Sequence, residues 1–211
     1  MSGPHEQLEH AEHAEHAAHS NRKIALLIAF LALGLAFSET LGKSAQTSAL
    51  TDNIRSSDTW AFFQAKTIRQ TTLRTAAESL TVTAPAIGNE EVRAAVGKQI
   101  DTWKKTVERY ESEPETNEGR KQLMARAQAA EKDRDLWLAK YHQYEFSSAA
   151  YQIGIVLASS AVITGIIALA YAAGTLGLVG VGFTALGLFA PHATHDAMHW
   201  LEHLLSGGGV H

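Results

Sequence analysis

The chain has 211 residues, a formal net charge of −4 and no cysteine. The lack of cysteine excludes disulfides and any zinc or iron–sulfur site bound by cysteine. All 18 Lys and Arg residues lie between Arg22 and Lys140, interspersed with acidic residues, which argues against the basic face of a nucleic-acid-binding protein.

Residues 1–23 are predicted to form a flexible tail rich in histidine and glutamate. Its histidines His10, His13, His16 and His19 recur at every third position. Three residues correspond to about 300° of an α-helix, so these side chains spread over half of the circumference. A solvated tail is therefore favoured over a weak metal-binding tract, the other use of histidine-rich segments.

Residues 24–42 form the first predicted transmembrane helix. The apolar run follows Arg22-Lys23 and has the ~20 residues that a helix needs to cross the hydrocarbon core. A cleavable secretory signal is the alternative, because Ala36 and Ser38 are small enough for a cleavage site. The long segment before the run argues against that alternative.

An acidic residue, Glu39, stands near the end of this predicted span. Lys43 follows one helical turn later, in the order that favours a Glu–Lys pair. An ion pair at the membrane interface is therefore favoured over a proton or ion site inside the membrane.

Residues 43–150 are predicted to form a helical, coiled-coil-like extramembrane region. No proline or glycine occurs from Ser44 to Ala84, so the first helix is expected to continue through this stretch. Pro85 interrupts it, and Asn89, followed by two glutamates, suits the N-cap of a second helix that ends around Pro114. The apolar stripe of this second helix comprises Val92, Val96, Ile100, Trp103, Val107 and Tyr110.

A third helix is expected to start near Glu115 or Thr116 and to run directly into the second span. Its stripe alternates steps of four and three residues, the spacing of a coiled-coil seam. Because alanines and aromatic residues outnumber Leu and Ile, this helix is expected to pack on the other two. The stripe comprises Leu123, Ala127, Ala130, Arg134, Trp137, Tyr141, Tyr144, Ser148 and Tyr151.

Residues 151–173 and 175–190 form the second and third predicted transmembrane helices. Together they are almost twice as long as one span and carry no charge, which indicates a helical hairpin that turns near Ala173-Gly174-Thr175. Ala161 and Gly165 are small and four residues apart, which permits close helix approach. The predicted fold class is an all-α membrane protein with three transmembrane helices.

Residues 191–211 form a second predicted tail, amphipathic and rich in histidine. His195, His199 and His203 are each four residues apart, so they share one helix face that could bind Zn²⁺ or Ni²⁺. The competing interpretation, a histidine face lying at the membrane interface, is favoured. The usual metalloprotease pattern places Glu directly after its first histidine, where this chain has Asp196.

The most distinctive soluble run extends from Ser57 to Arg69 and reads SDTWAFFQAKTIR. It stands between the His/Glu-rich tail with its first span and a C-terminal hairpin entered through Tyr144-Glu145-Phe146. This combination resembles the bacterial membrane proteins grouped as domain of unknown function 4337. The resemblance covers most of the chain up to Pro191 and implies the same architecture, without implying an activity or a catalytic residue.

The predicted function is that of a non-enzymatic structural or accessory subunit that acts through helix–helix association. Its expected partners are the lipid bilayer and either further copies of the chain or other subunits of a membrane complex, and not nucleic acid. No nucleophile–base pair supports an enzyme, and no cofactor is expected apart from a possible Zn or Ni in the tail. Metal binding or sensing through the histidine tails is the alternative. A channel or transporter is less favoured, because Glu39 is the only acid in the predicted spans.

The expected location is the bacterial inner membrane, with the two termini on opposite sides because the number of spans is odd. Arg22-Lys23 precedes the first span, whereas residues 192–211 contain no Lys or Arg. The positive-inside rule therefore places the N-terminus in the cytoplasm and the central region in the periplasm. The 16 basic residues of the central region favour the reverse orientation, but long domains count little in this rule.

Overall fold

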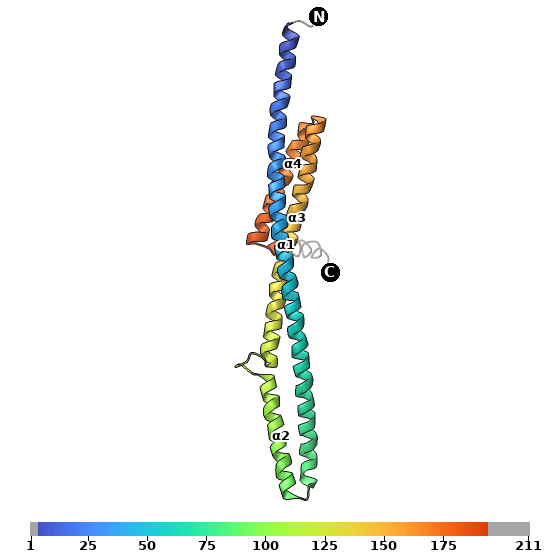
Figure 1. Cartoon of the computed structure of the whole chain (residues 1–211), viewed down its shortest axis with the longest axis vertical. Helices are drawn as coiled ribbons and strands as arrows, with labels where there is room; N and C mark the ends of the chain where they lie inside the picture. The colour runs from blue at the N-terminus through green and yellow to red at the C-terminus, as the bar shows by residue number, and fades with distance from the viewer. Residues whose placement is uncertain (1–3, 194–211) are drawn as a thin grey trace, which may run out of the picture. The chain divides into compact units, whose positions relative to one another are not determined.

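The structure is a computed structural model that describes the backbone of residues 4–193 and the side chains of residues 22–193 (Figure 1). Its elements are α1 (Pro4–Thr83), the 3₁₀ turn η1 (Ala84–Ala86), α2 (Glu90–Glu111), α3 (Arg120–Thr164) and α4 (Ile167–Phe189). No strand occurs among the described residues, so the predicted all-α class is confirmed. Helix α1 begins at Pro4, inside the segment for which the sequence predicted a flexible tail.

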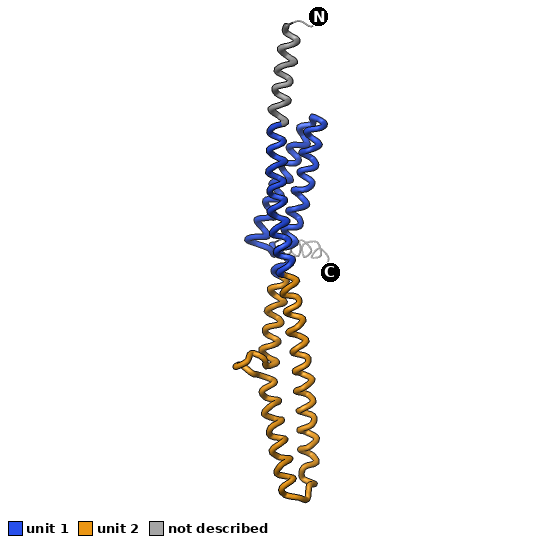
Figure 2. Tube along the Cα trace, in the orientation of Figure 1, with its two compact units in different colours: residues 1–48, 136–211 blue, residues 49–135 orange. Residues whose placement is uncertain are grey.

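The chain divides into two compact units, shown in different colours in Figure 2. Unit 1 comprises Met1–Ser48 and Leu136–His211, and unit 2 comprises Ala49–Asp135. Helices α1 and α3 each supply residues to both units. In the described part of the chain, α4 and sections of α1 and α3 are long and apolar enough to cross a membrane.

Unit 1 is a three-helix bundle of α1, α3 and α4, whose segments run side by side in Figure 2. Its core is built from small residues and a few large ones, a composition that lets helix backbones approach closely. The buried members are Ile24, Leu31, Tyr151, Ala158, Ala161 and Ala173.

Aromatic rings fill the spaces that glycines leave in this bundle. A Cβ atom at Gly34 would lie 2.7 Å from Cζ of Tyr151, and one at Gly180 would lie 2.8 Å from the same ring. At Gly187, a Cβ would lie 2.6 Å from Cε1 of Tyr144. Carbon atoms in contact are ordinarily 3.5 to 4.0 Å apart, so the helices can pack at this distance only if these positions have no side chain.

The hairpin between α3 and α4 turns at Gly165 and not at Ala173-Gly174-Thr175, which corrects the sequence-based prediction. Gly165 has φ of 72°, a left-handed conformation that glycine adopts readily. The predicted third span over residues 175–190 would cover only about 24 Å. The observed α4 has 23 residues and covers about 34 Å, which matches a hydrocarbon core of ~30 Å.

The prediction that Ala161 and Gly165 permit close helix approach is wrong for Gly165. Ala161 is buried, but a Cβ atom at Gly165 would have no neighbour within 4 Å. Close helix approach therefore depends on Gly34, Gly180 and Gly187 instead of Gly165.

Unit 2 is a helical hairpin in which α1 returns through η1 into α2 and then α3. Asn89 caps α2 as predicted, because its Oδ1 accepts hydrogen bonds from the backbone N–H groups of Glu91 and Val92 at 2.9 and 3.2 Å. The predicted stripe of α2 is buried at Ile100, but Val92 is 48% exposed and does not belong to it.

The boundaries of the loop between α2 and α3 differ from the prediction. Helix α2 ends at Glu111, and α3 begins at Arg120 instead of Glu115 or Thr116. The intervening segment holds Pro114, which disfavours a helical conformation for Glu113. In the same segment Asn117 has φ of 56°, a left-handed conformation that asparagine tolerates better than most residues.

Candidate functional site

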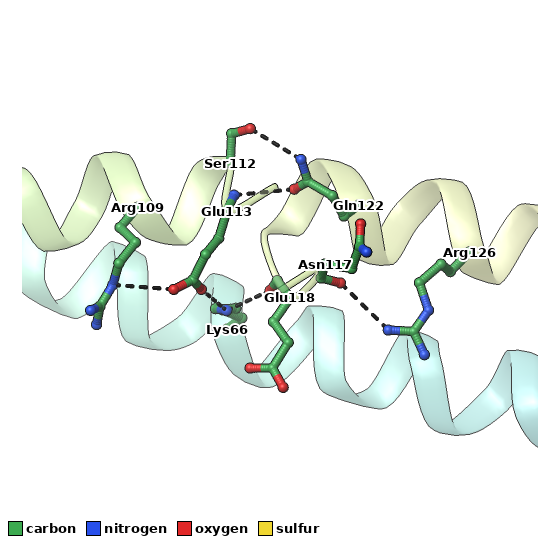
Figure 3. Close-up of polar contacts among 8 residues, drawn as sticks. All are labelled: Lys66, Arg109, Ser112, Glu113, Asn117, Glu118, Gln122 and Arg126. Carbon is green, nitrogen blue, oxygen red and sulfur yellow. Dashed lines mark hydrogen bonds and ion pairs between the residues drawn. The ribbon is translucent and has the colours of Figure 1, made fainter. Parts of the chain in front are cut away.

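The loop of residues 112–119 is held against α1 by side chains of the run from Ser57 to Arg69. Lys66 of α1 is 6% exposed, and its Nζ lies 3.2 Å from Oε2 of Glu113 (Figure 3). The same ammonium group donates a hydrogen bond to the carbonyl oxygen of Glu118. One buried cation thus binds the loop at a carboxylate and at a backbone group, and we call this arrangement the loop clamp.

Other charged and aromatic groups complete the surroundings of Lys66. Its Nζ lies 5.6 Å from the ring centroid of Phe62 and 5.4 Å from that of Tyr110, within the range of cation–π attraction. The other carboxylate oxygen of Glu113 lies 3.7 Å from Nε of Arg109, so this glutamate bridges two cations. The buried charge of Lys66 is therefore compensated on the loop side, which a buried ammonium requires.

Arg120, the first residue of α3, makes the second set of contacts with α1. Its Nε donates to Oγ1 of Thr67 at 2.9 Å, and its Nη1 donates to Oε1 of Gln70 at 2.7 Å. Nη1 also lies 2.8 Å from Oε2 of Glu111, and the guanidinium stands 5.0 Å from the ring centroid of Phe63. The start of α3 is thereby joined both to α1 and to the end of α2.

Glu111 has a lowered pKa for reasons visible in these contacts. The largest is a hydrogen bond from Nε2 of Gln70 at 3.1 Å, followed by partial burial, which acts in the opposite direction. The positive charges of Arg120 and Lys121 add to the lowering. The carboxylate of Glu111 is therefore stabilised in its ionised form, as the network requires.

The side chain of Gln122 in α3 and the lack of a side chain at Gly119 also hold the loop in place. Gln122 accepts from the N–H of Glu113 at 3.3 Å and donates to Oγ of Ser112 at 3.2 Å. A Cβ atom at Gly119 would lie 2.3 Å from the nitrogen of Glu113, so no other residue fits there without a shift. The contacts of the loop thus reach α2, α3 and α1.

Trp60 of α1 makes a further contact between α1 and α3. Its Nε1 donates to Oε1 of Glu131 at 2.8 Å, and its ring meets Phe63 edge-on at 5.4 Å between centroids. Trp60 and Phe63, three residues apart on α1, therefore pack against each other. The distinctive run therefore supplies the side chains that connect α1 to the rest of unit 2.

A separate cluster of three hydroxyl groups lies inside unit 1, one from each helix. Oγ of Ser38 lies 3.0 Å from Oγ of Ser147 and 3.0 Å from Oγ1 of Thr184, and the last two are 2.7 Å apart. Ser147 and Thr184 also contact the carbonyl oxygen of Gly180 at 2.7 and 3.0 Å. All three hydroxyl groups belong to buried residues, so the cluster satisfies polar groups within an otherwise apolar bundle.

The remaining sequence-predicted sites have different outcomes. Glu39 is contacted by Gln152, whose Nε2 lies 3.4 Å from its Oε1, and no ion pair with Lys43 occurs in the part of the chain with described side chains. Residue 39 therefore contacts a neighbouring helix instead of the next turn of its own. His195, His199 and His203 lie outside the described residues. In the part of the chain that the structure describes, no group of three His, Asp or Glu side chains is placed to hold a metal ion.

Sequence patterns did not predict the loop clamp, although they contain one signal for it. Thr59, Phe63, Lys66 and Gln70 recur at steps of four and three residues, so Lys66 falls on the inward stripe of α1. A lysine on such a stripe indicates a buried cation with an acidic partner. The partner itself, Glu113, is 47 residues away in a loop, and no local pattern identifies it.

Comparisons with known proteins give a single assignment. No curated protein and no solved structure matches the chain. A family model, described as Domain of unknown function (DUF4337), matches residues 20–190, which include all of unit 2 with the loop clamp and the part of unit 1 between residues 20 and 190. The chain belongs to this family.

Proposed function

We propose that the protein is a non-enzymatic membrane subunit that acts through helix–helix association, with its partner bound along the outer face of α1 in unit 2. Sections of α1, α3 and α4 anchor it in the bilayer, and the bacterial inner membrane is the proposed location. The proposed partner is a second copy of the same chain.

The observation that carries the proposal is a second stripe of residues on α1. The inner stripe recurs at seven-residue intervals and faces α2 and α3; its members are Ala49, Ser56, Phe63, Gln70 and Ala77. The outer stripe has the same interval and is exposed; its members are Ile54, Ala61, Ile68, Thr75 and Val82. We call the second set the outer seam.

Helix geometry separates the two stripes and makes the second one unusual. Each outer position follows an inner one by five residues, which corresponds to about 140° around the helix. Ile54, Ile68 and Val82 are 53%, 67% and 81% exposed. A two-layer hairpin needs only one apolar stripe per helix, so a second stripe at coiled-coil spacing favours a further helix as partner.

Membrane insertion gives the association a defined geometry. Copies inserted in the same orientation are related by a rotation axis along the membrane normal. Their α1 helices then run parallel, and each outer-seam residue faces its own equivalent. Insertion in one orientation therefore favours a parallel homo-oligomer over an antiparallel one.

Cysteine cross-linking in membranes tests this proposal without interference, because the chain has no native cysteine. Ile68→Cys and Ile54→Cys are each expected to form a disulfide-linked dimer under mild oxidation. Arg69→Cys and Arg55→Cys are the matched controls, since each exposed arginine follows an outer-seam residue by one position and points about 100° away. Equal cross-linking at all four positions, or none at the two isoleucines, would contradict the proposal. A disulfide bond to a different protein would show that the partner is another subunit and not a second copy of the chain.

A further inference from the structure

A long groove runs between α1 and α4 on the outside of unit 1. It consists of two adjoining hollows of about 540 and 480 Å³, both of which are lined by Leu27, Gly174 and Leu178. The first hollow continues past Phe30 and Leu33 to Phe37. The second ends at Lys23.

Glycines open this groove, and two buried side chains form its floor. A Cβ atom at Gly174 would have no neighbour within 4 Å, so space is open above this position. At Gly177 a Cβ would lie 2.7 Å from Leu31, and at Gly34 it would lie 2.7 Å from Tyr151. Any larger residue at these positions would fill the groove or push its floor aside.

The polarity of the groove changes along its length. Its long section is lined almost entirely by aliphatic and aromatic carbon, whereas its end carries the exposed Lys23, with Tyr171 and Thr175 beside it. The fourteen steps from Lys23 to Phe37 cover about 21 Å of helix axis. One leaflet of the hydrocarbon core is about 15 Å deep, so the groove extends from the expected headgroup level through one leaflet.

We propose that this groove binds one anionic phospholipid, with an acyl chain along its apolar section and the phosphate at Lys23. The inference rests on the proposed membrane insertion of unit 1. Charge complementarity identifies the lipid class, because Lys23 and the adjacent exposed Arg22 form a cationic end where a phosphate would lie. The same charges disfavour a second copy in this groove, since a symmetric pairing would bring two such cationic ends together.

Native mass spectrometry of the full-length protein, released from detergent after incubation with lipid, tests this site. The probes are phosphatidylglycerol and phosphatidylcholine with identical acyl chains, offered in equal amounts. The wild-type protein is expected to retain phosphatidylglycerol about fivefold better, the preference that one basic residue near a membrane surface provides. Lys23→Gln should remove most of this preference.

Two glycine variants separate groove binding from general lipid adhesion. Gly174→Leu fills the groove and should abolish the bound lipid, whereas Gly182→Leu adds the same side chain at an open position outside the groove and should retain it. Circular dichroism checks that both variants keep their helices, and Lys23→Gln, an exposed substitution, tests the site independently of folding.

Three results would overturn the lipid site. In the first, the wild-type protein retains the two lipids equally. In the second, Gly174→Leu retains lipid as well as the wild type does. In the third, the wild type is a dimer without bound lipid, and Gly174→Leu dissociates that dimer. The third result would assign the groove to a second copy. A protein that purifies without detergent would instead overturn the membrane insertion itself, so the two failures are distinguishable.

Discussion

Lys66 Nζ and Glu113 Oε2 are 3.2 Å apart, although the two residues are 47 positions apart in the sequence. The lysine side chain is 7% exposed and the glutamate 20% exposed, so this ion pair is largely withdrawn from water. Such a pair is costly to break on one side only, because the remaining charge stays buried.

Glu113→Gln should destabilise unit 2 more than Lys66→Met does. The first change leaves the buried ammonium without its carboxylate and should cost about 3 kcal/mol. The second replaces the ammonium by an apolar group of similar length, and Glu113 keeps Arg109 as partner. Amide hydrogen exchange of residues 112–119 in the full-length protein, with thermal unfolding in detergent, measures both effects. A larger loss in Lys66→Met would contradict this description of the clamp.

Acid should loosen the start of α3 through Glu111. The hydrogen bond from Gln70 lowers the pKa of this carboxyl most, partial burial raises it, and the charges of Arg120 and Lys121 lower it further. Because the pKa is lowered overall, the ionised form of Glu111 stabilises the fold. That stabilisation is present above the ordinary pKa of 4.5 and is lost as the pH falls through the lower folded value. Because the side chain is 40% exposed, the effect should be modest.

Hydrogen exchange around residues 107–123 between pH 6 and pH 3 measures this dependence. Since exchange chemistry itself varies with pH, the comparison is between the wild type and Glu111→Gln at each pH. The variant should be less protected near pH 6, and the difference should shrink as the pH falls. A difference that stays constant would show that the ionisation of Glu111 does not support the fold.

Gly34→Ala should destabilise unit 1 by about 1–3 kcal/mol, the usual cost of overpacking. The added methyl group would meet the ring of Tyr151, which also packs on Gly180. Gly182→Ala is the matched control, because a Cβ at that position meets nothing within 4 Å and alanine favours the helix. Thermal unfolding in detergent compares the two variants, and Tyr151→Leu should partly rescue Gly34→Ala. Equal stability of both alanine variants would refute the packing argument.

Orientation is tested by labelling intact cells with an impermeant maleimide. Single cysteines at Ala14, at Glu115 in the exposed part of the loop and at Ser206 report the N-terminus, unit 2 and the C-terminus. Labelling at Glu115 and Ser206 but not at Ala14 is expected from the positive-inside rule. Labelling at Ala14 alone would reverse the orientation, and labelling at both termini would exclude an odd number of spans.

Metal binding by the C-terminal histidines stays a prediction from their spacing. Calorimetry with Zn²⁺ and Ni²⁺ on the purified protein is the direct measurement. The double variant His195→Ala/His199→Ala should lose the binding, and substitution of the N-terminal histidines should not affect it. Binding no tighter than millimolar in the wild type would exclude a metal-sensing role.

Patterns of neighbouring residues predicted the helices well, but they did not predict contacts between segments that are distant in the sequence. The cap at Asn89 depends on contacts within four consecutive residues, Asn89 to Val92, so the sequence sufficed to place it. The hairpin turn was predicted near Ala173-Gly174-Thr175, but Ala173 is buried in the core of unit 1 and the turn lies at Gly165. Lys66 could be identified as inward-facing from its spacing, but Glu113 could not be identified as its partner, because a loop conformation decides where that carboxylate lies.

The hydroxyl cluster of Ser38, Ser147 and Thr184 has a consequence for the order in which the chain is made. Ser38 and Ser147 are 109 residues apart, and Thr184 follows Ser38 by 146. At a synthesis rate of ~5–20 residues per second, Ser38 is made roughly 5–20 s before its first partner. During that interval a serine hydroxyl in a helix can bond to the carbonyl oxygen four residues earlier. The contacts of Ser38 with the two later helices form only once Thr184 is present, so the bundle is complete only when α4 has been synthesised.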